Sequence, residues 1–424
     1  MQTLPGFRDF LPADCAVRNY IFAQWREVAR RYGFVEWDGP VLEPTELFTK
    51  KSGPEIVTQL FNFADKGERE VALRPELTPT LARVVAAHER EFKKPLKWFS
   101  IPQCFRYEKQ QRGRLREHFQ LNCDIIGEGG GHADVELIAL CIDFLRSFGF
   151  ASQDFVVRIS DRGFWTEFLM EQSVPEERWA ETLQIIDKAE REDPDRTAQK
   201  LGPLADPFFQ RLKSGGALNK NLRWLMNALG QRGLADFVEI DVNIVRGLAY
   251  YTGVVFEVFD RAKKFRAIAG GGRYDNLIHQ LSDGAVSLPA LGFAMGDVVL
   301  GNLIGENTAA RTRMEDVIAR EQQLDIYVVI AKEERRPDAL RQVQVLRDLH
   351  YRVDYPLVSA KVKVGKQFQN AEQLGATVAL LFGDEWPKVK VKNLATRDEQ
   401  DVPHEDVLAH LAAFPSLSSR AGSG

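Results

Sequence analysis

The chain has 424 residues, of which 44% are hydrophobic and 27% are charged, and its formal net charge is -4. This length exceeds what one ordinary hydrophobic core supports and predicts two or three domains with the composition of a globular protein. The net charge excludes a strongly basic nucleic-acid coat, although a local basic surface on an acidic protein is still compatible with RNA binding.

The cysteines and the N-terminal segment indicate the class of protein and its cellular location. Cys15, Cys104, Cys123 and Cys141 lie far apart without a CxxC pair, which argues against zinc-ribbon and redox motifs and predicts reduced, mostly buried thiols. MQTLPGFRDFLP lacks the basic start and apolar core of a secretion signal, and no segment approaches about eighteen uninterrupted apolar residues. We therefore expect a cytoplasmic protein with no membrane segment.

The first third of the chain mixes helical and strand patterns. Residues 16 to 31 place apolar side chains at helical spacing before Tyr32-Gly33, and REVALRPELTPTLARVVAAH predicts a strand, a turn and a helix that begins at Thr78-Pro79. Residues 97 to 127 predict two strands joined by a long basic loop. Residues 134 to 147 predict an amphipathic helix with Asp134 as its N-cap.

The middle of the chain changes character twice. Residues 174 to 234 are charged and helical, which predicts a helical insertion within a larger domain. The strand-rich pattern resumes in FVEIDVNIVRGLAYYTGVVFEVFD, where a glycine-bracketed turn between two apolar runs carries an arginine and two tyrosines. It continues through a triple glycine at 270 to 272, between a strand and a helix start, and ends at ALGFAMGDVVLGNLI.

The last third predicts a separate domain. Residues 303 to 323 are polar and predict a linker, and residues 324 to 414 alternate strand and helix, which is typical of a small α/β domain with a largely parallel sheet. Residues 415 to 424 predict a disordered tail. The remaining core then comprises residues 1 to 173 and 235 to 302.

Four clusters combine charged or hydroxyl side chains with strand ends: RPELT at 74 to 78, the loop and strands at 105 to 124, RGLAYYTG, and GGGRYD. Arginine donates in a bidentate manner to phosphate, and neighbouring carboxylates can hold Mg²⁺ or an ammonium group, so a ligand with phosphates and an amine suits this mixture. Each cluster alone also fits an ordinary turn or solvated loop, and the triple glycine lacks the GxxxxGK[ST] pattern. His118 and His132 lack partners at metal-ligand spacing.

In this order the clusters resemble the class II aminoacyl-tRNA synthetases, and specifically the histidyl-tRNA synthetase family. GPVLEPTELFTKKSG resembles motif 1, FRYEKQQRGRLREHFQLNCDIIG resembles motif 2, and ALGFAMGDVVL occupies the position of motif 3. RGLAYYTG and AGGGRYD resemble the two histidine-specific signatures, and VGKQFQNAEQLGATVALLFG resembles the anticodon-binding domain. Ordered motifs over nearly the whole chain are far more specific than any single one.

The resemblance implies a multidomain α/β and α+β fold, with an antiparallel catalytic sheet flanked by helices, a helical insertion and a C-terminal α/β anticodon-binding domain. It implies a homodimer formed through motif 1. It also implies a ligase that activates histidine with ATP, in the presence of Mg²⁺, and transfers it to the 3' end of tRNA(His).

The resemblance assigns site residues by motif position. By this resemblance, Arg106 and Arg246 would be catalytic and would contact the α-phosphate of ATP, and Arg106 would also contact the histidine carboxylate. ATP would further be contacted by Glu108, by Arg114 at the γ-phosphate, and by His118 at the adenine ring. The histidine pocket would comprise Glu76, Thr78, Arg106, Gln120, Asp124, Arg246, Tyr250 and Tyr251, with Glu76 and Thr78 at the amino group and the tyrosines at the imidazole.

Three positions depart from the family pattern. Val299 stands where motif 3 has an arginine that clamps ATP, Ala249 stands where an aspartate usually precedes the tyrosine pair, and His118 stands where another aromatic ring commonly stacks on adenine. Two alternatives therefore remain. One is a catalytically silent relative that serves as regulatory subunit of ATP phosphoribosyltransferase in histidine biosynthesis, and the other is an RNA-binding sensor without activity.

Overall fold

The computed structural model describes residues 2–52, 54–107, 115–189, 192–213, 220–242, 244, 251–358, 362–414 and 417. The chain divides into two compact units, Met1–Glu315 and Asp316–Gly424. Among the helices of these described residues, none combines the length and apolar character needed to cross a membrane.

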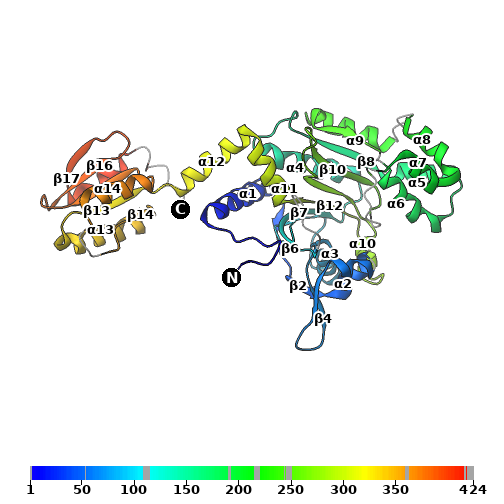
Figure 1. Cartoon of the computed structure of the whole chain (residues 1–424), viewed down its shortest axis with the longest axis horizontal. Helices are drawn as coiled ribbons and strands as arrows, with labels where there is room; N and C mark the ends of the chain where they lie inside the picture. The colour runs from blue at the N-terminus through cyan, green and yellow to red at the C-terminus, as the bar shows by residue number, and fades with distance from the viewer. Residues whose placement is uncertain are drawn as a thin grey trace. The chain divides into compact units, whose positions relative to one another are not determined.

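The first unit is built on a mostly antiparallel sheet (Figure 1). Within the described residues it has nine strands, in the order β1-β5-β7-β12-β11-β10-β8-β9, and β6 pairs with β7 beside this path. Pairs β1–β5 and β8–β9 are parallel and the other described pairs are antiparallel, as expected for the catalytic sheet. The strands are β1 (Val35–Glu36), β5 (Leu96–Ser100), β6 (Gln103–Phe105), β7 (Glu117–Ile126), β8 (Phe155–Asp161), β9 (Val238–Ile240), β10 (Val254–Asp260), β11 (Ala269–Arg273) and β12 (Ala290–Gly296).

Helices cover both faces of this sheet. Successive side chains of a strand point to opposite faces. On β12, Phe293 therefore packs on Phe144 of α4, whereas Ala290 belongs to a buried cluster with Leu81 of α3 and Ile278 of α10. The helices around this sheet include α1 (Pro12–Arg31), α2 (Thr45–Ser52), α3 (Thr78–Ala87), α4 (Gly131–Ser147), α10 (Leu277–Leu281) and α11 (Asp297–Glu306).

The start of α4 differs from the prediction. Its N-cap is Gly130, and Asp134 lies inside the first turn instead of capping it. The Asp134 carboxylate is buried and pairs with the guanidinium of Arg273 at 2.5 Å. The Asp134 carboxylate thus forms a tertiary ion pair instead of the helix-capping hydrogen bond that the sequence pattern predicts.

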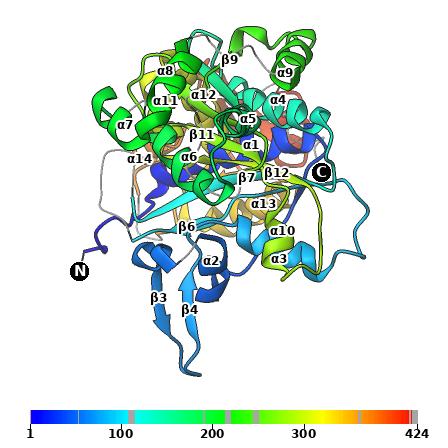
Figure 2. The ribbon, with the colours of Figure 1, turned by 90° about the vertical axis from the view of Figure 1, so that its right-hand side faces the viewer.

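A small sheet extends from the first unit. Strands β2 (Leu42–Pro44), β4 (Glu70–Leu73) and β3 (Phe61–Ala64) pair in that order, and the β3–β4 hairpin projects beyond the neighbouring elements in both views (Figure 1 and Figure 2). The side chains of Val41, Leu42 and Phe63 are exposed here, and so is Val35 on β1. This motif 1 region therefore presents apolar surface to solvent within the single chain.

The predicted insertion is helical. Its helices are α6 (Trp179–Lys188), α7 (Pro194–Leu201), α8 (Ala205–Lys213) and α9 (Lys220–Gln231), and α5 (Arg162–Glu171) precedes them. Trp165 of α5 packs with Phe208 of α8 in a separate buried cluster, and its indole N–H donates to the carbonyl of Val242 at 2.7 Å. The short 3-10 helices in the described part of the chain are η1 (Pro54–Gln59), η2 (Glu176–Arg178), η3 (Gly202–Leu204), η4 (Ala235–Phe237), η5 (Glu333–Arg335) and η6 (His404–Asp406).

The triple glycine lies inside strand β11, and the expected position between a strand and a helix start is wrong. A Cβ on Gly271 would lie 2.2 Å from the carbonyl oxygen of Gly292, and one on Gly272 would lie 2.7 Å from that of Val254. These close backbone approaches explain the glycines.

The cysteines are free thiols, as predicted. Cys104, Cys123 and Cys141 are buried, and Cys15 on α1 is partly exposed. Burial raises the pKa of Cys104 to about 12 and that of Cys123 and Cys141 well above the ordinary value.

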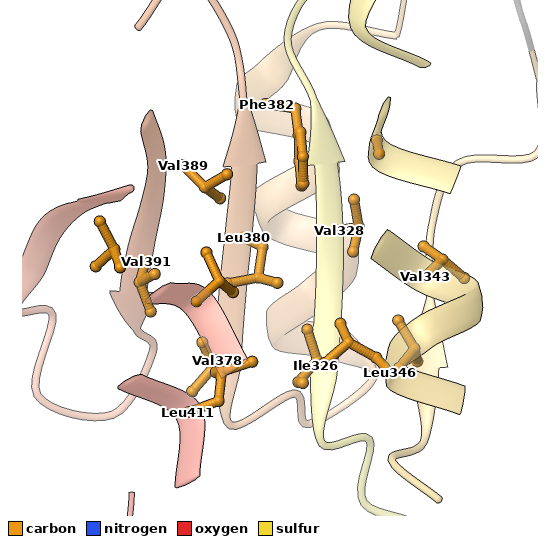
Figure 3. Packing of buried hydrophobic residues seen from close by; sticks show 14 of the residues in the cluster. Ile326, Val328, Val343, Leu346, Val378, Leu380, Phe382, Val389, Val391 and Leu411 are labelled. Atoms are coloured by element: carbon orange, nitrogen blue, oxygen red, sulfur yellow. The ribbon is translucent and has the colours of Figure 1, made fainter. Parts of the chain in front are cut away.

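The second unit contains a five-stranded sheet in the order β14-β13-β15-β16-β17 within the described residues. Strands β14, β13 and β15 are parallel, whereas β16 and β17 add antiparallel, so the sheet is less parallel than predicted. Figure 3 shows its core, in which Ile326 and Val328 pack with Leu346 and Leu380. The elements are β13 (Ile326–Ile330), α13 (Arg336–Asp348), β14 (Val353–Asp354), α14 (Val364–Gln373), β15 (Val378–Phe382), β16 (Lys388–Asn393), β17 (Glu399–Pro403) and α15 (Val407–Ala412).

The segment expected to be a linker is helical. Residues 303 to 323 fall largely in the end of α11 and in α12 (Thr308–Gln322), and the boundary between the two units lies within α12. Leu417, which the sequence assigns to the tail, is buried in the core of the second unit. The other residues of 415 to 424 lie outside the described part of the chain.

Candidate active site

A cavity of about 470 Å³ opens on the face of the sheet that carries α3. Strands β7, β11 and β12 and the turn before α3 supply most of its walls. The predicted site residues that line this cavity are Glu76, Thr78, Arg106, Gln120, Asp124 and Tyr251. Residues more than a hundred positions apart in the sequence therefore meet in one hollow.

Strand β7 contributes a row of polar side chains to one of its faces. His118, Gln120, Asn122 and Asp124 alternate along the strand and so share that face. The amide of Gln120 donates to Asn122 Oδ1 at 2.9 Å, and His118 Nε2 lies 3.3 Å from Gln120 Oε1. The hydrogen bonds hold the side chains in fixed orientations before any ligand binds.

Asp124 occupies a space that a glycine leaves open. It pairs in register with Gly292 of β12, and a Cβ at Gly292 would lie 2.0 Å from Asp124 Oδ1. The hydroxyl of Tyr274 donates a hydrogen bond to the same oxygen. Burial raises the pKa of Asp124 to about 7, although the Tyr274 hydroxyl and the Lys51 ammonium act against this rise.

Glu76 is the second carboxylate of the cavity, and its side chain is partly buried. Burial favours its protonated form, but the ammonium of Lys51 and the guanidinium of Arg106 outweigh burial and hold the pKa of Glu76 below its usual value. Lys51 Nζ lies 2.5 Å from Glu76 Oε2. Arg106 in turn donates from Nε to the carbonyl of Pro75 at 3.0 Å, which fixes it beside the turn that carries Glu76.

His118 sits at the end of the polar row, outside the cavity lining. Burial, together with the nearby Arg106, lowers the pKa of His118 to about 4, so its ring is neutral at pH 7. A neutral ring donates here from Nε2 to Gln120 and presents a flat aromatic surface without a charge.

A buried ion network fixes the N-terminal segment to the end of β7. Arg8 Nε lies 2.6 Å from Glu117 Oε1, and Arg8 Nη2 lies 3.0 Å from Asp297 Oδ2. Asp297 also accepts a hydrogen bond from the backbone N–H of Phe119 at 2.9 Å. Burial raises the pKa of Asp297 to about 6 in spite of Arg8. The motif 3 segment is thereby joined to the strand that carries the polar row.

Arg273 of the second signature has a structural position. It pairs with Asp134 and with Asp275, and it donates to the carbonyls of Glu128 and Gly130. Its guanidinium ties β11 to the start of α4, so we do not assign it to a ligand.

Four predicted site residues, Glu108, Arg114, Arg246 and Tyr250, lie outside the described residues. Ala249 does so as well, whereas Val299 is partly buried in α11. The fold therefore brings six of the predicted positions together and leaves these four as predictions.

Three residues of the site were missed by sequence reasoning. Asn122 and Tyr274 line the cavity, and Lys51 contacts Glu76. The two-residue period of a strand would have identified Asn122 between Gln120 and Asp124. Tyr274 belongs to a signature already singled out, but the contact of Lys51 depends on tertiary packing and leaves no pattern in the sequence.

The cavity suits a ligand with several charges. An ammonium group fits Glu76, a ring N–H fits Asp124, and a carboxylate or phosphate fits Arg106. Within the described residues, no group of three or more His, Cys, Asp or Glu side chains could hold a metal ion.

Comparisons with known proteins point in one direction. The family model described as histidyl-tRNA synthetase matches residues 6–297, and the model described as anticodon binding domain matches residues 325–413. A histidine–tRNA ligase from Opitutus terrae is 45% identical and covers 97% of this chain and 98% of its own length. A chloroplastic/mitochondrial histidine–tRNA ligase from Arabidopsis thaliana is 37% identical, with coverage of 95% and 85%.

Solved structures share the fold. Histidyl-tRNA synthetase from Nostoc sp. PCC 7120 superposes with a TM-score of 0.73 at 22% identity and covers 97% of this chain and 98% of its own. A Bacillus halodurans protein, described as an ATP phosphoribosyltransferase regulatory subunit/histidyl-tRNA synthetase, gives a TM-score of 0.68 at 22% identity, with coverage of 90% and 97%. At this level of identity the likeness establishes the fold alone.

Proposed function

The chain belongs to the histidyl-tRNA synthetase family and acts as a histidine–tRNA ligase, and we propose that the cavity beside α3 is where it activates histidine. The observation that carries this proposal is the pair of carboxylates that line one cavity with Arg106, the partly buried Glu76 and the buried Asp124. An amino acid whose side chain carries a ring N–H offers one donor group to each carboxylate and its own carboxylate to the arginine.

Histidine recognition follows from these positions. Glu76 and Thr78 receive the α-ammonium group, and Asp124 receives the imidazole N–H. Gln120, Tyr250 and Tyr251 complete the pocket. A site that hydrogen-bonds a ring nitrogen rejects amino acids without one, because its buried acceptor would lose its partner.

In the first step, a carboxylate oxygen of histidine bonds to the α-phosphorus of ATP while the bond from that phosphorus to the bridging oxygen breaks. Histidyl-adenylate forms and pyrophosphate leaves. Arg106 and Arg246 are the residues proposed to balance charge on the carboxylate and the α-phosphate, so their contribution is positional and electrostatic.

ATP is the second substrate, and we place its adenine next to the neutral ring of His118, with Glu108 and Arg114 along its phosphates. Mg²⁺ is proposed to arrive with ATP, bound by the phosphate oxygens, as part of the substrate.

In the second step the histidyl group passes from the adenylate to the 3'-terminal ribose of tRNA(His), with release of AMP. We propose that residues 324–414 bind the anticodon and that the helical insertion, residues 174–234, serves the catalytic domain formed by residues 1–173 and 235–302. The helical segment at 303–323 would join the two parts. The substrates favour a cytoplasmic location.

A homodimer is proposed from the motif 1 region. Val35, Val41, Leu42 and Phe63 are exposed there, and a second copy of the chain would remove this apolar surface from water. Sedimentation of the purified protein tests this, and a monomer at micromolar concentration would contradict it.

The regulatory-subunit alternative is less supported. The Bacillus halodurans structure shows that the fold alone does not separate the two functions. The match to an anticodon-binding domain over residues 325–413 favours the ligase, because a regulatory subunit needs no tRNA contact.

Histidine-dependent exchange of pyrophosphate into ATP is the test of the proposed function. Purified protein with saturating ATP and Mg²⁺ should exchange pyrophosphate when histidine is added and not when other amino acids are added. Absence of histidine-dependent exchange would overturn the assignment of the cavity.

A further inference from the structure

A buried lysine lies behind the wall of the cavity. Lys51, on α2, has a fully buried side chain, and its Nζ lies 2.5 Å from Glu76 Oε2. Lys51 is not part of the cavity lining, whereas Glu76 is. A cation thus contacts the carboxylate from within the protein, whereas a ligand would reach Glu76 from the cavity.

Placing an ammonium group in the interior is costly unless a carboxylate compensates it. Glu76 supplies such a carboxylate to Lys51, and Lys51 in turn favours the ionised form of Glu76, which burial alone would disfavour. The same ammonium also favours the ionised form of Asp124. One buried cation consequently acts on both carboxylates of the histidine pocket.

We propose that Lys51 is a positioning residue, which keeps the Glu76 carboxylate ionised and oriented for the α-ammonium group of histidine. The inference rests on the proposed function of the cavity. Without Lys51, Glu76 would stay in its partly buried position but lose the ammonium 2.5 Å from its carboxylate, so it would take up a proton at a higher pH. A neutral carboxyl group binds an ammonium ion much less well than a carboxylate does.

The other groups that face Glu76 would not produce the same pH dependence, because their charge does not change in this pH range. Arg106 faces it from the segment after β6, and an arginine keeps its charge throughout the accessible pH range. Cys104 of β6 also faces Glu76, and its pKa of about 12 keeps the thiol neutral. On the side of Asp124, the facing groups are Tyr274 and Lys51.

A comparison of two ligands isolates the contact with Glu76. Imidazolepropionate is histidine without its α-amino group, so the ratio of its dissociation constant to that of histidine reports the ammonium contact. The contributions of Asp124 and of the imidazole ring, including their titrations, cancel in this ratio. Calorimetry gives both constants without catalysis, from about pH 8 to pH 5.5.

The variants are Lys51→Met and the control Lys50→Met. Lys50 is the neighbouring lysine on α2, and it pairs at the surface with Glu46 and Asp283, so the two variants lose the same charge. In the wild type and in Lys50→Met the ratio should stay constant across the pH range. In Lys51→Met it should fall as the pH falls, by about 10-fold or more, the worth of a charged hydrogen bond.

Several outcomes would overturn the proposal. A ratio in Lys51→Met that equals the wild-type ratio at every pH, or that is lower by a constant factor, would reduce Lys51 to a structural role. Lys51→Arg should restore the flat profile. If Lys51→Met does not fold, Lys51→Gln replaces it. The wild type alone also provides a test, because a ratio of the two dissociation constants that falls as the pH falls in the wild type would contradict the proposal. Absence of histidine binding to the wild type would instead refute the proposed function.

Discussion

Gly292 is the position at which one added carbon should disturb histidine recognition most directly. In Gly292→Ala the new Cβ would lie 2.0 Å from Asp124 Oδ1, about 1.4 Å closer than the 3.4 Å at which ordinary contact begins. It would also lie 2.8 Å from Asp124 Cγ and 3.0 Å from the carbonyl oxygen of Cys123. The backbone cannot yield easily because Gly292 pairs with strands on both sides. The Asp124 carboxylate must therefore move and give up its hydrogen bond with Tyr274.

The expected cost has two parts. Overpacking of this kind destabilises a protein by about 1 to 3 kcal/mol, which a thermal melt would detect. The loss of a correctly placed charged acceptor should raise the KM for histidine by about 10- to 100-fold in pyrophosphate exchange, while the KM for ATP changes little. The melting temperature reports damage to the fold, and the KM for histidine reports damage to histidine recognition.

Gly305→Ala is the matched control. Gly305 lies in α11, and a Cβ there would meet nothing within 4 Å, so the substitution should leave the KM for histidine unchanged and slightly raise the melting temperature. If Gly292→Ala folds and keeps the wild-type KM for histidine, then Asp124 does not contact histidine, and the assignment of the ring N–H to that carboxylate is wrong.

Three further predictions concern the mechanism. Arg246→Ala should lower the exchange rate by about 100- to 1000-fold while histidine affinity changes little, because the guanidinium acts on charge at the α-phosphate; an unchanged rate would remove Arg246 from the mechanism. The KM for histidine should fall as the pH rises through about 7, because Asp124 is protonated below its pKa of about 7 and ionised above it. Asp124→Asn should abolish this step, and a step that persists in the variant belongs to another group. Deleting residues 324–424 should reduce tRNA aminoacylation more than exchange, since exchange needs no tRNA, and an equal loss of both would assign this unit to folding or dimerisation.

Motif order predicted the cavity better than local patterns predicted the elements around it. Glu76, Gln120 and Asp124 were assigned from their motifs, and the fold brings them together because β7 and the turn before α3 border the same hollow. The antiparallel sheet was expected for the same reason. Residues in motifs carry such information because their spacing is tied to one arrangement of strands.

Local signals failed where a distant residue decides the outcome. Asp134 has the sequence context of a helix cap, but the guanidinium of Arg273 takes its carboxylate. The triple glycine resembles a turn, yet neighbouring carbonyls require it within a strand. Lys51 resembles the solvated Lys50 beside it, and only the packing of α2 against the turn at Glu76 distinguishes the two.

The burial of three of the four cysteines makes the thiols reporters of folding. Cys104, Cys123 and Cys141 are enclosed and held in the unreactive protonated form, so a maleimide dye can reach only Cys15 in the folded chain. The labelling stoichiometry should rise from one to four when the first unit opens. The native chain can therefore be labelled with a fluorophore at one site, Cys15 on α1. Without any engineered cysteine, the number of labelled thiols per chain also measures how much of the protein is unfolded.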